Sequence, residues 1–111
     1  MTGVQTCALP ISVREQTADA PDLIACWRQP NPPRRLPRLQ GVPVLIVTTE
    51  ASYHAVYDHC TARYLTQAGI PNTFMRLEKE GIPGNGHMVM LEKNNLVVAA
   101  LLQKWLTAHV K

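Results

Sequence analysis

A continuous apolar run, VPVLIVT at residues 42–48, constrains the fold of this chain more than any other feature. Runs of β-branched residues without polar alternation are typical of strands that are buried on both faces of a parallel sheet. The segment YDHCTARYLTQAG at 57–69 then places apolar side chains at helical spacing, and Gly69 provides a stop signal. A second strand is expected over NTFMRLE at 72–78. The order strand, helix, strand predicts two parallel strands joined by a right-handed crossover.

The segment NLVVAALLQKWLTAHV at 95–110 predicts a closing helix, with Asn94 or Asn95 as its cap. Four apolar side chains share one face of this helix: Val98, Leu101, Leu102 and Trp105. The fold class expected for residues 41–111 is therefore α/β, with two parallel strands and their flanking helices. Because a parallel sheet needs cover on both faces and these elements are too few to supply it, we expect an incomplete sheet from a longer protein.

The amino-terminal part of the chain carries weaker signals. Residues 1–11, MTGVQTCALPI, resemble the translation of a short-read sequencing adapter, and we expect them to be derived from it. Within residues 12–40, DLIACW at 22–27 predicts a short helix remnant with Asp22 as its cap. The prolines and arginines of PNPPRRLPRL at 30–39 predict an extended connector, with a ligand for an SH3-like groove as the alternative interpretation.

Composition excludes several classes of protein. The formal net charge of +3 and the isoelectric point near 9.0 come without a dense Lys/Arg face, so no nucleic-acid partner is predicted. No apolar run approaches the roughly 20 residues of a membrane helix, so no membrane span is predicted, and no signal-peptide pattern is visible. Cys7, Cys26 and Cys60 are odd in number and lack C-x-x-C spacing, which argues against a zinc site and a disulfide framework. No cofactor or metal is therefore predicted.

The loop GIPGNGHMVMLEKN at 81–94 holds the best candidate for chemistry. It places His87 directly after Gly84, Asn85 and Gly86, where few side chains crowd the imidazole. An exposed histidine of this kind is typical of a proton-transfer group, because a neutral imidazole accepts a proton and later returns it. The apolar residues after His87 are interpreted as core side chains, with the lining of a substrate pocket as the alternative: Met88, Met90 and Leu91.

The other histidines carry less information. His54 and His59 flank the start of a predicted helix and are interpreted as polar surface, and His109 lies near the terminus. A metal cluster of His54, Asp58 and His59 is disfavoured, because the spacing i, i+4, i+5 puts these ligands on separate faces of a helix.

Three segments of the chain, taken together, carry a family resemblance. They are the strand end TTEAS at 48–52, the helix end QAGI at 67–70 and the loop GNGHMVMLEKN at 84–94. With them, the chain resembles the carboxyl-terminal end of an α/β-hydrolase over residues 39–106. In that family the triad runs in the order nucleophile, acid, histidine, and the histidine follows the last strand. The resemblance places His87 at the catalytic histidine. It implies serine-type, esterase-like hydrolysis of a small ester substrate by the full-length parent.

The acid of the triad is less clearly marked. Ser52 stands at the position that aligns with the family's acid, and a serine brings no charge to stabilise an imidazolium. The resemblance therefore favours Glu50, the nearest carboxylate at the carboxyl end of the strand, where sites gather in open α/β sheets. Asp58, which is also expected to cap the following helix, and an acid outside this chain are the alternatives.

The nucleophile is not recognisable in these 111 residues. The family's nucleophile lies in a G-x-S-x-G elbow, and neither Ser12 nor Ser52 has that glycine pattern; Cys26 and Cys60 lack it too. We therefore expect the chain alone to be inactive and to contribute the catalytic histidine to a longer enzyme. The alternative is a small non-enzymatic α/β binding module in which His87 has no catalytic role.

Overall fold

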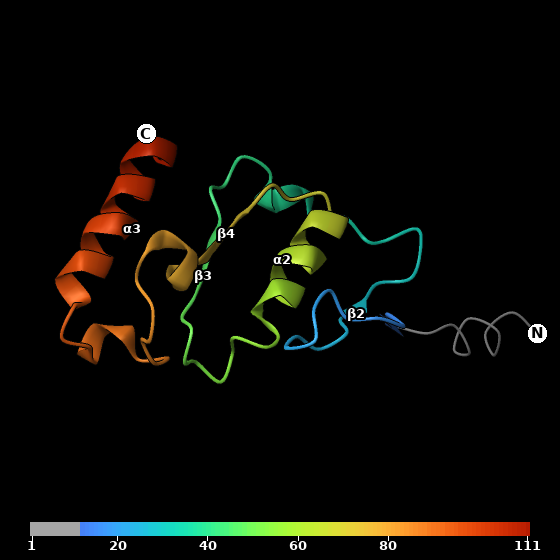
Figure 1. Ribbon diagram of the computed structural model, residues 1–111. Coiled ribbons are helices and arrows are strands. Elements are labelled where there is room, and N and C mark those ends of the chain that lie inside the picture. The colour runs from blue at the N-terminus through green and yellow to red at the C-terminus, as the bar shows by residue number, and fades with distance from the viewer. Residues whose placement is uncertain (1–11) are drawn as a thin grey trace, which may run out of the picture.

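The computed structural model describes residues 12–111, so the predicted adapter-derived segment lies outside the described residues. Residues 12–111 form two helices and two pairs of strands (Figure 1). Their bounds are β1 Val13–Arg14, β2 Trp27–Arg28, β3 Leu45–Thr48, α2 Asp58–Gln67, β4 Thr73–Arg76 and α3 Asn95–His109. Three short 3-10 turns complete the structure, at Pro37–Leu39, Leu77–Glu80 and Val89–Leu91. None of the helices between residues 12 and 111 has the length and apolarity needed to cross a bilayer.

Strands β3 and β4 pair in parallel, as the sequence predicted, with Leu45 opposite Thr73 and Thr48 opposite Arg76. Both strands are shorter than expected. Pro43 has no N–H to donate to a ladder at the start of the first strand. The second strand ends where the chain winds into the 3-10 turn Leu77–Glu80, which stops at Gly81 with a φ of 82°. The left-handed conformation at Gly81 suits a residue that has no Cβ.

The two-stranded sheet lies between the two helices, with α2 on one side and α3 on the other (Figure 1). The core forms between the sheet and α3, and its buried members are Met75, Leu77, Ile82, Val98 and Trp105. The predicted apolar face of α3 is confirmed, because Leu101 and Leu102 also pack against this core. The Trp105 indole N–H donates a hydrogen bond of 3.1 Å to Thr73 Oγ1, which fixes α3 against β4. A mixed α/β arrangement is therefore confirmed.

The helix predicted at residues 22–27 does not form, and that prediction is wrong. Trp27–Arg28 instead pairs antiparallel with Val13–Arg14, and the Glu15 N–H donates to the carbonyl of Cys26 at 2.8 Å. The segment is only six residues long, which is too short for a stable isolated helix, so pairing with β1 satisfies its backbone better.

A disulfide joins Cys26 to Cys60, the third residue of α2. The odd cysteine count had argued against a disulfide framework, and this bond corrects that interpretation. Its two half-cystines are 34 residues apart in the sequence, so the bond holds the amino-terminal segment against α2.

Reduction of this disulfide should lower the free energy of unfolding by about 3–4 kcal/mol, because it restores the loop entropy of the unfolded chain. Urea unfolding with and without a phosphine reductant measures this difference. A Cys7→Ser background keeps the remaining thiol out of the comparison. Equal unfolding midpoints in the two conditions would contradict the expected contribution.

The proline-rich connector runs along the end of α2 without regular secondary structure beyond Pro37–Leu39. Gln29, just before it, exchanges two hydrogen bonds with Gln67 of α2, from its N–H to Oε1 at 2.9 Å and from Gln67 Nε2 to its carbonyl at 2.7 Å. The Gln29 side chain also makes a reciprocal pair of bonds with the backbone of Arg34. These contacts hold an irregular segment against the helix.

Candidate active site

His87 lies on the loop between the 3-10 turns Leu77–Glu80 and Val89–Leu91, and its side chain is exposed. The loop is held by the segment that follows β3. Three hydrogen bonds of 2.9 Å join the two segments: Thr49 Oγ1 to the Gly86 carbonyl, the Ala51 N–H to the Asn85 carbonyl, and the Gly84 N–H to Glu50 Oε1. These bonds fix the backbone of the loop directly before His87.

Ser52 is the residue that contacts the imidazole of His87. Its Oγ lies 2.9 Å from His87 Nδ1, and the same oxygen accepts a hydrogen bond of 2.9 Å from the N–H of His54. A hydroxyl oxygen has two lone pairs, so it is able to accept from both nitrogens. With the His87 proton on Nδ1, the Ser52 hydroxyl accepts both bonds and the lone pair of the imidazole lies on Nε2. Among the described residues, Nε2 has no hydrogen-bond partner.

Two aromatic side chains lie against the imidazole of His87. The His54 ring stacks on the His87 ring, with centroids 4.4 Å apart and planes at 18°, and the Tyr53 ring lies 4.8 Å away. His54 Nδ1 is in turn 3.0 Å from Asp58 Oδ1. His54 therefore belongs to the candidate site and is not plain polar surface. Its ring lies between His87, on which it stacks, and the carboxylate of Asp58, to which it is hydrogen-bonded.

Asp58 does not cap the helix, in contrast to the expectation from the sequence. It is the first residue of α2, the N-cap is Tyr57, and no side chain makes a capping hydrogen bond there. The carboxylate of Asp58 binds His54 instead. The pKa of Tyr57 is raised above its ordinary value, first by loss of hydration and then by repulsion from Tyr53 and Asp58. Tyr57 therefore stays a neutral phenol, and Asp58 supplies the charge of this cluster.

Glu50, the acid favoured by the sequence, has a different partner in the structure. Its carboxylate is exposed and accepts the hydrogen bond from the Gly84 N–H. The reason is a turn after β3, in which the Ser52 N–H donates to the Thr49 carbonyl at 3.1 Å. This turn directs the side chain at position 52, and not the one at position 50, to the imidazole.

The buried side chain of Asn85 holds the loop to the start of α3. No specific signal in the sequence pointed to this role. The Asn85 side chain is buried, with 4 % exposed, and its Nδ2 donates a hydrogen bond of 3.0 Å to Asn94 Oδ1. Asn94 was predicted to cap α3, and it is the N-cap residue, but its side chain binds Asn85 and not the helix backbone. This amide pair joins the two ends of the segment that contains His87.

The apolar residues that follow His87 do not fill the core. Met88, Met90 and Leu91 are 54 %, 58 % and 77 % exposed, and only Val89 of this run packs against the core. The interpretation as core side chains is therefore wrong for these three residues. They form an apolar surface next to the imidazole in sequence.

A curated fungal protein matches most of this chain. The protein named "Probable secreted lipase phiG", from Fungal sp. (strain ATCC 74256), is 42% identical over 105 residues, which is 95% of this chain. The match covers 27% of that protein's length, so this chain spans about a quarter of its relative. No protein-family model matches the chain, and no solved structure matches it either. The similarity supports a lipase- or esterase-like relationship.

Proposed function

We propose that this chain is the carboxyl-terminal part of a serine-type α/β-hydrolase and that it carries the catalytic histidine, His87. The complete protein would hydrolyse a small ester or lipid substrate. The observation that carries the proposal is the placement of His87, which is exposed on a fixed glycine loop with Nδ1 bound by Ser52 and Nε2 free. The lipase name of the relative supports the same class of substrate.

In the proposed mechanism, Nε2 of His87 accepts the proton of the nucleophilic hydroxyl as that oxygen attacks the ester carbonyl. The alcohol leaving group then takes the proton back from the imidazolium. A water molecule attacks the acyl-enzyme in the second half of the reaction, with His87 again as the base. The nucleophile and the oxyanion donors would come from the rest of the enzyme, because these 111 residues contain no G-x-S-x-G elbow.

Ser52 is not suited to be that nucleophile, although it touches the imidazole. Its side chain is buried, at 7 % exposed, so a substrate carbonyl cannot reach it. It also lies on the Nδ1 side of the ring, where the acid of a triad orients the imidazole. We therefore assign Ser52 the orienting role, without the charge that an aspartate would bring.

Position 52 carries no carboxylate, but the carboxylate of Asp58 lies in the same cluster of side chains. Asp58 binds His54, and the His54 ring stacks on His87, so the stacked His54 ring connects the carboxylate to the imidazole. We assign His54 and Asp58 a positioning role that favours the imidazolium formed during the reaction. We assign Glu50 a positioning role as well, because its carboxylate accepts a hydrogen bond from the Gly84 N–H and so holds the loop that carries His87.

The complete protein is proposed to be secreted. The relative's name includes secretion, and the Cys26–Cys60 disulfide is of the kind that persists in oxidising compartments.

Ser52→Ala in the complete enzyme should lower kcat for ester hydrolysis by roughly 10-fold with little change in KM, since about one hydrogen bond to the base is lost. Ser52→Thr keeps a hydroxyl and is the matched control, expected to retain more activity. Glu50→Gln keeps an acceptor for the Gly84 N–H and should cost less than about threefold. Steady-state kinetics on a p-nitrophenyl ester measures all three.

The ranking of these variants decides between the two candidate partners of His87. A larger loss of kcat for Glu50→Gln than for Ser52→Ala would show that Glu50 is the acid and that the orienting role of Ser52 is wrong. Circular dichroism of each variant separates loss of catalysis from loss of fold.

A further inference from the structure

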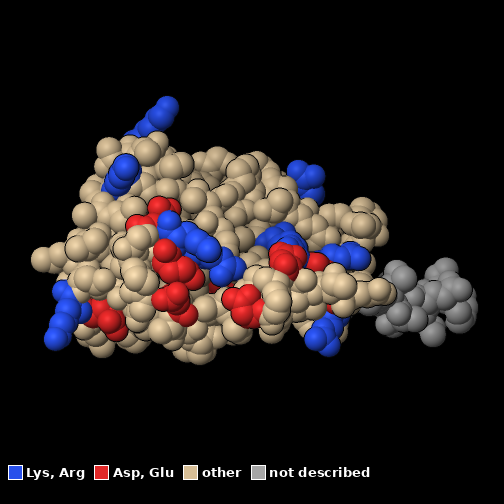
Figure 2. All heavy atoms as spheres, viewed as in Figure 1, with Lys and Arg blue, Asp and Glu red and all other residues tan. Residues whose placement is uncertain are grey.

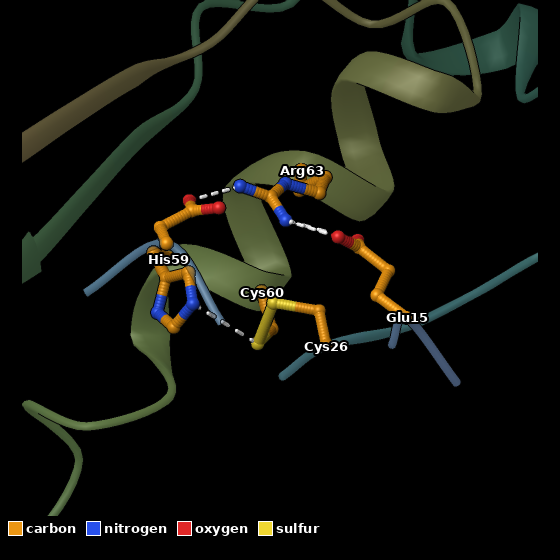
Figure 3. Close-up of polar contacts among 6 residues, drawn as sticks. Glu15, Cys26, His59, Cys60 and Arg63 are labelled. Atoms are coloured by element: carbon orange, nitrogen blue, oxygen red, sulfur yellow. Dashed lines mark hydrogen bonds and ion pairs between the residues drawn. A yellow bond between two sulfur atoms is a disulfide. The ribbon is translucent and has the colours of Figure 1, made fainter. Parts of the chain in front are cut away.

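A thiol–imidazole cluster, formed by Cys26, His59 and Cys60, lies where β2 meets the first turn of α2. The His59 ring faces the sulfur of Cys60, and the disulfide to Cys26 passes beside it (Figure 3). One ligand atom from each residue lies within 4.8 Å of the other two. None of the three side chains contacts His87, so the cluster is separate from the proposed active site.

His59 is buried without a good hydrogen-bond partner. Its side chain is 7 % exposed, which corrects its interpretation as polar surface. Within the described part of the chain, Nδ1 has no partner, and the neighbour of Nε2 is the weakly accepting sulfur of Cys60 at 3.6 Å. Burial of a polar ring with so little compensation is unfavourable, and each such group calls for an explanation. A metal ion bound at Nε2 would replace the weak sulfur contact with a strong bond, while Nδ1 would stay without a partner.

The donor set matches the preference of zinc. Zn²⁺ takes thiolate sulfur at about 2.3 Å and imidazole nitrogen at about 2.0–2.1 Å in tetrahedral geometry, which puts its donors about 3.5–3.8 Å apart. The separation of His59 Nε2 and Cys60 Sγ, 3.6 Å, already lies in this range. The two sulfurs are bonded to each other, so they reach such a separation only after the disulfide opens.

Other contacts keep the halves of the cluster together without the disulfide. Arg63 of α2 forms ion pairs with Glu15, at 2.7 Å, and with Asp19 (Figure 3 shows the first). The N–H of Glu15 in turn binds the carbonyl of Cys26. Cys60 lies in the first turn of α2, where the helix N-terminus favours a thiolate. Figure 2 shows acidic and basic side chains next to one another on one face of the molecule.

We propose that Cys26, His59 and Cys60 bind one Zn²⁺ when the two cysteines are in the dithiol form. Opening the disulfide requires two electrons and two protons: an external dithiol supplies both and becomes a disulfide, whereas a phosphine supplies the electrons, becomes its oxide with the oxygen of water, and leaves the protons of that water to the two thiols. Zinc then displaces the two thiol protons and binds Sγ of each cysteine and Nε2 of His59, with the fourth position open to solvent. Disulfide formation and zinc binding exclude each other, because they use the same two sulfurs.

The test uses the full 111-residue chain with Cys7→Ser, refolded after phosphine reduction in the presence and in the absence of equimolar zinc. Bound metal is counted after gel filtration, and Cd²⁺ is the optical probe through its sulfur-to-metal charge-transfer band. We expect one metal ion per reduced chain and none per oxidised chain. His59→Ala should weaken zinc binding by more than the roughly 10- to 100-fold that loss of an outer-shell partner costs. His109→Ala is the matched control and should bind zinc as the parent does.

Two results would overturn the proposal. One is the absence of bound zinc in the reduced chain that is refolded in the presence of zinc. The other is equal zinc affinity of the parent and the His59→Ala chain, which would mean that the thiols bind metal without the imidazole. Removal of binding by Cys26→Ser and by Cys60→Ser completes the expected set.

Discussion

Replacement of His87 by alanine in the complete enzyme should lower kcat/KM for ester hydrolysis by about 10⁴- to 10⁶-fold. The reason is that no other group in the described residues presents a free imidazole nitrogen from a loop fixed in this way. The fold should change little, because His87 is exposed and lies outside the core cluster. Steady-state kinetics on a p-nitrophenyl ester measures the loss, and thermal unfolding measures the stability.

His109→Ala is the matched control for this variant, since His109 binds the Trp105 carbonyl near the end of α3 and has no part in the site. Near-full activity of the His87→Ala enzyme would refute the catalytic role. It would also favour the alternative in which the chain is a binding module and His87 is incidental.

The 111-residue chain by itself should not turn over p-nitrophenyl esters beyond the background of free imidazole. An imidazole without an activated nucleophile and without oxyanion donors provides only weak catalysis. Addition of the remaining part of the enzyme as a separate chain should restore saturable turnover if the two parts assemble. A burst of product followed by turnover is the measurement that reports an acyl-enzyme.

Saturable turnover with a burst by the isolated chain would contradict this expectation. Loss of that activity in Ser52→Ala would then assign the nucleophile to Ser52 and make our account of the site wrong.

The fold was predictable wherever one physical effect dominated. The apolar run at 42–48 and the amphipathic pattern at 95–110 are strong local signals, and a strand and a helix form there. The predicted burial of the strand on both faces is wrong, because residues 45–47 are only half-buried and Val42 is 48 % exposed. The parallel pairing of β3 with β4 followed from the order of the elements. The segment at 22–27 was mispredicted, because its conformation depends on pairing with β1 and on the disulfide, and both are contacts distant in sequence.

The candidate site was predictable in part for the same reason. The position of His87 on a glycine loop is a local property, so the sequence predicted it. Its partners are not local: Ser52 reaches the ring through a turn after β3, and His54 reaches it by stacking. Spacing along the chain favoured Glu50, and the direction of the side chains at the end of β3 brought Ser52 to the imidazole.

The burial of His59 illustrates a further limit. Its place at the start of a helix suggested an exposed polar residue. The spacing of the cysteines did not show that the neighbouring Cys60 pairs with Cys26. The disulfide places Cys26 beside α2 and so completes the thiol–imidazole cluster.

Alkylation by a substrate-like chloromethyl ketone tests the central claim most directly. Such a reagent binds as the acyl part of a substrate and alkylates the imidazole nitrogen that faces the nucleophile. With the complete enzyme, we predict that one equivalent abolishes ester hydrolysis and that peptide mapping places the label on Nε2 of His87. Inactivation with the label on His54, or without a labelled histidine, would contradict the proposal that His87 is the catalytic base.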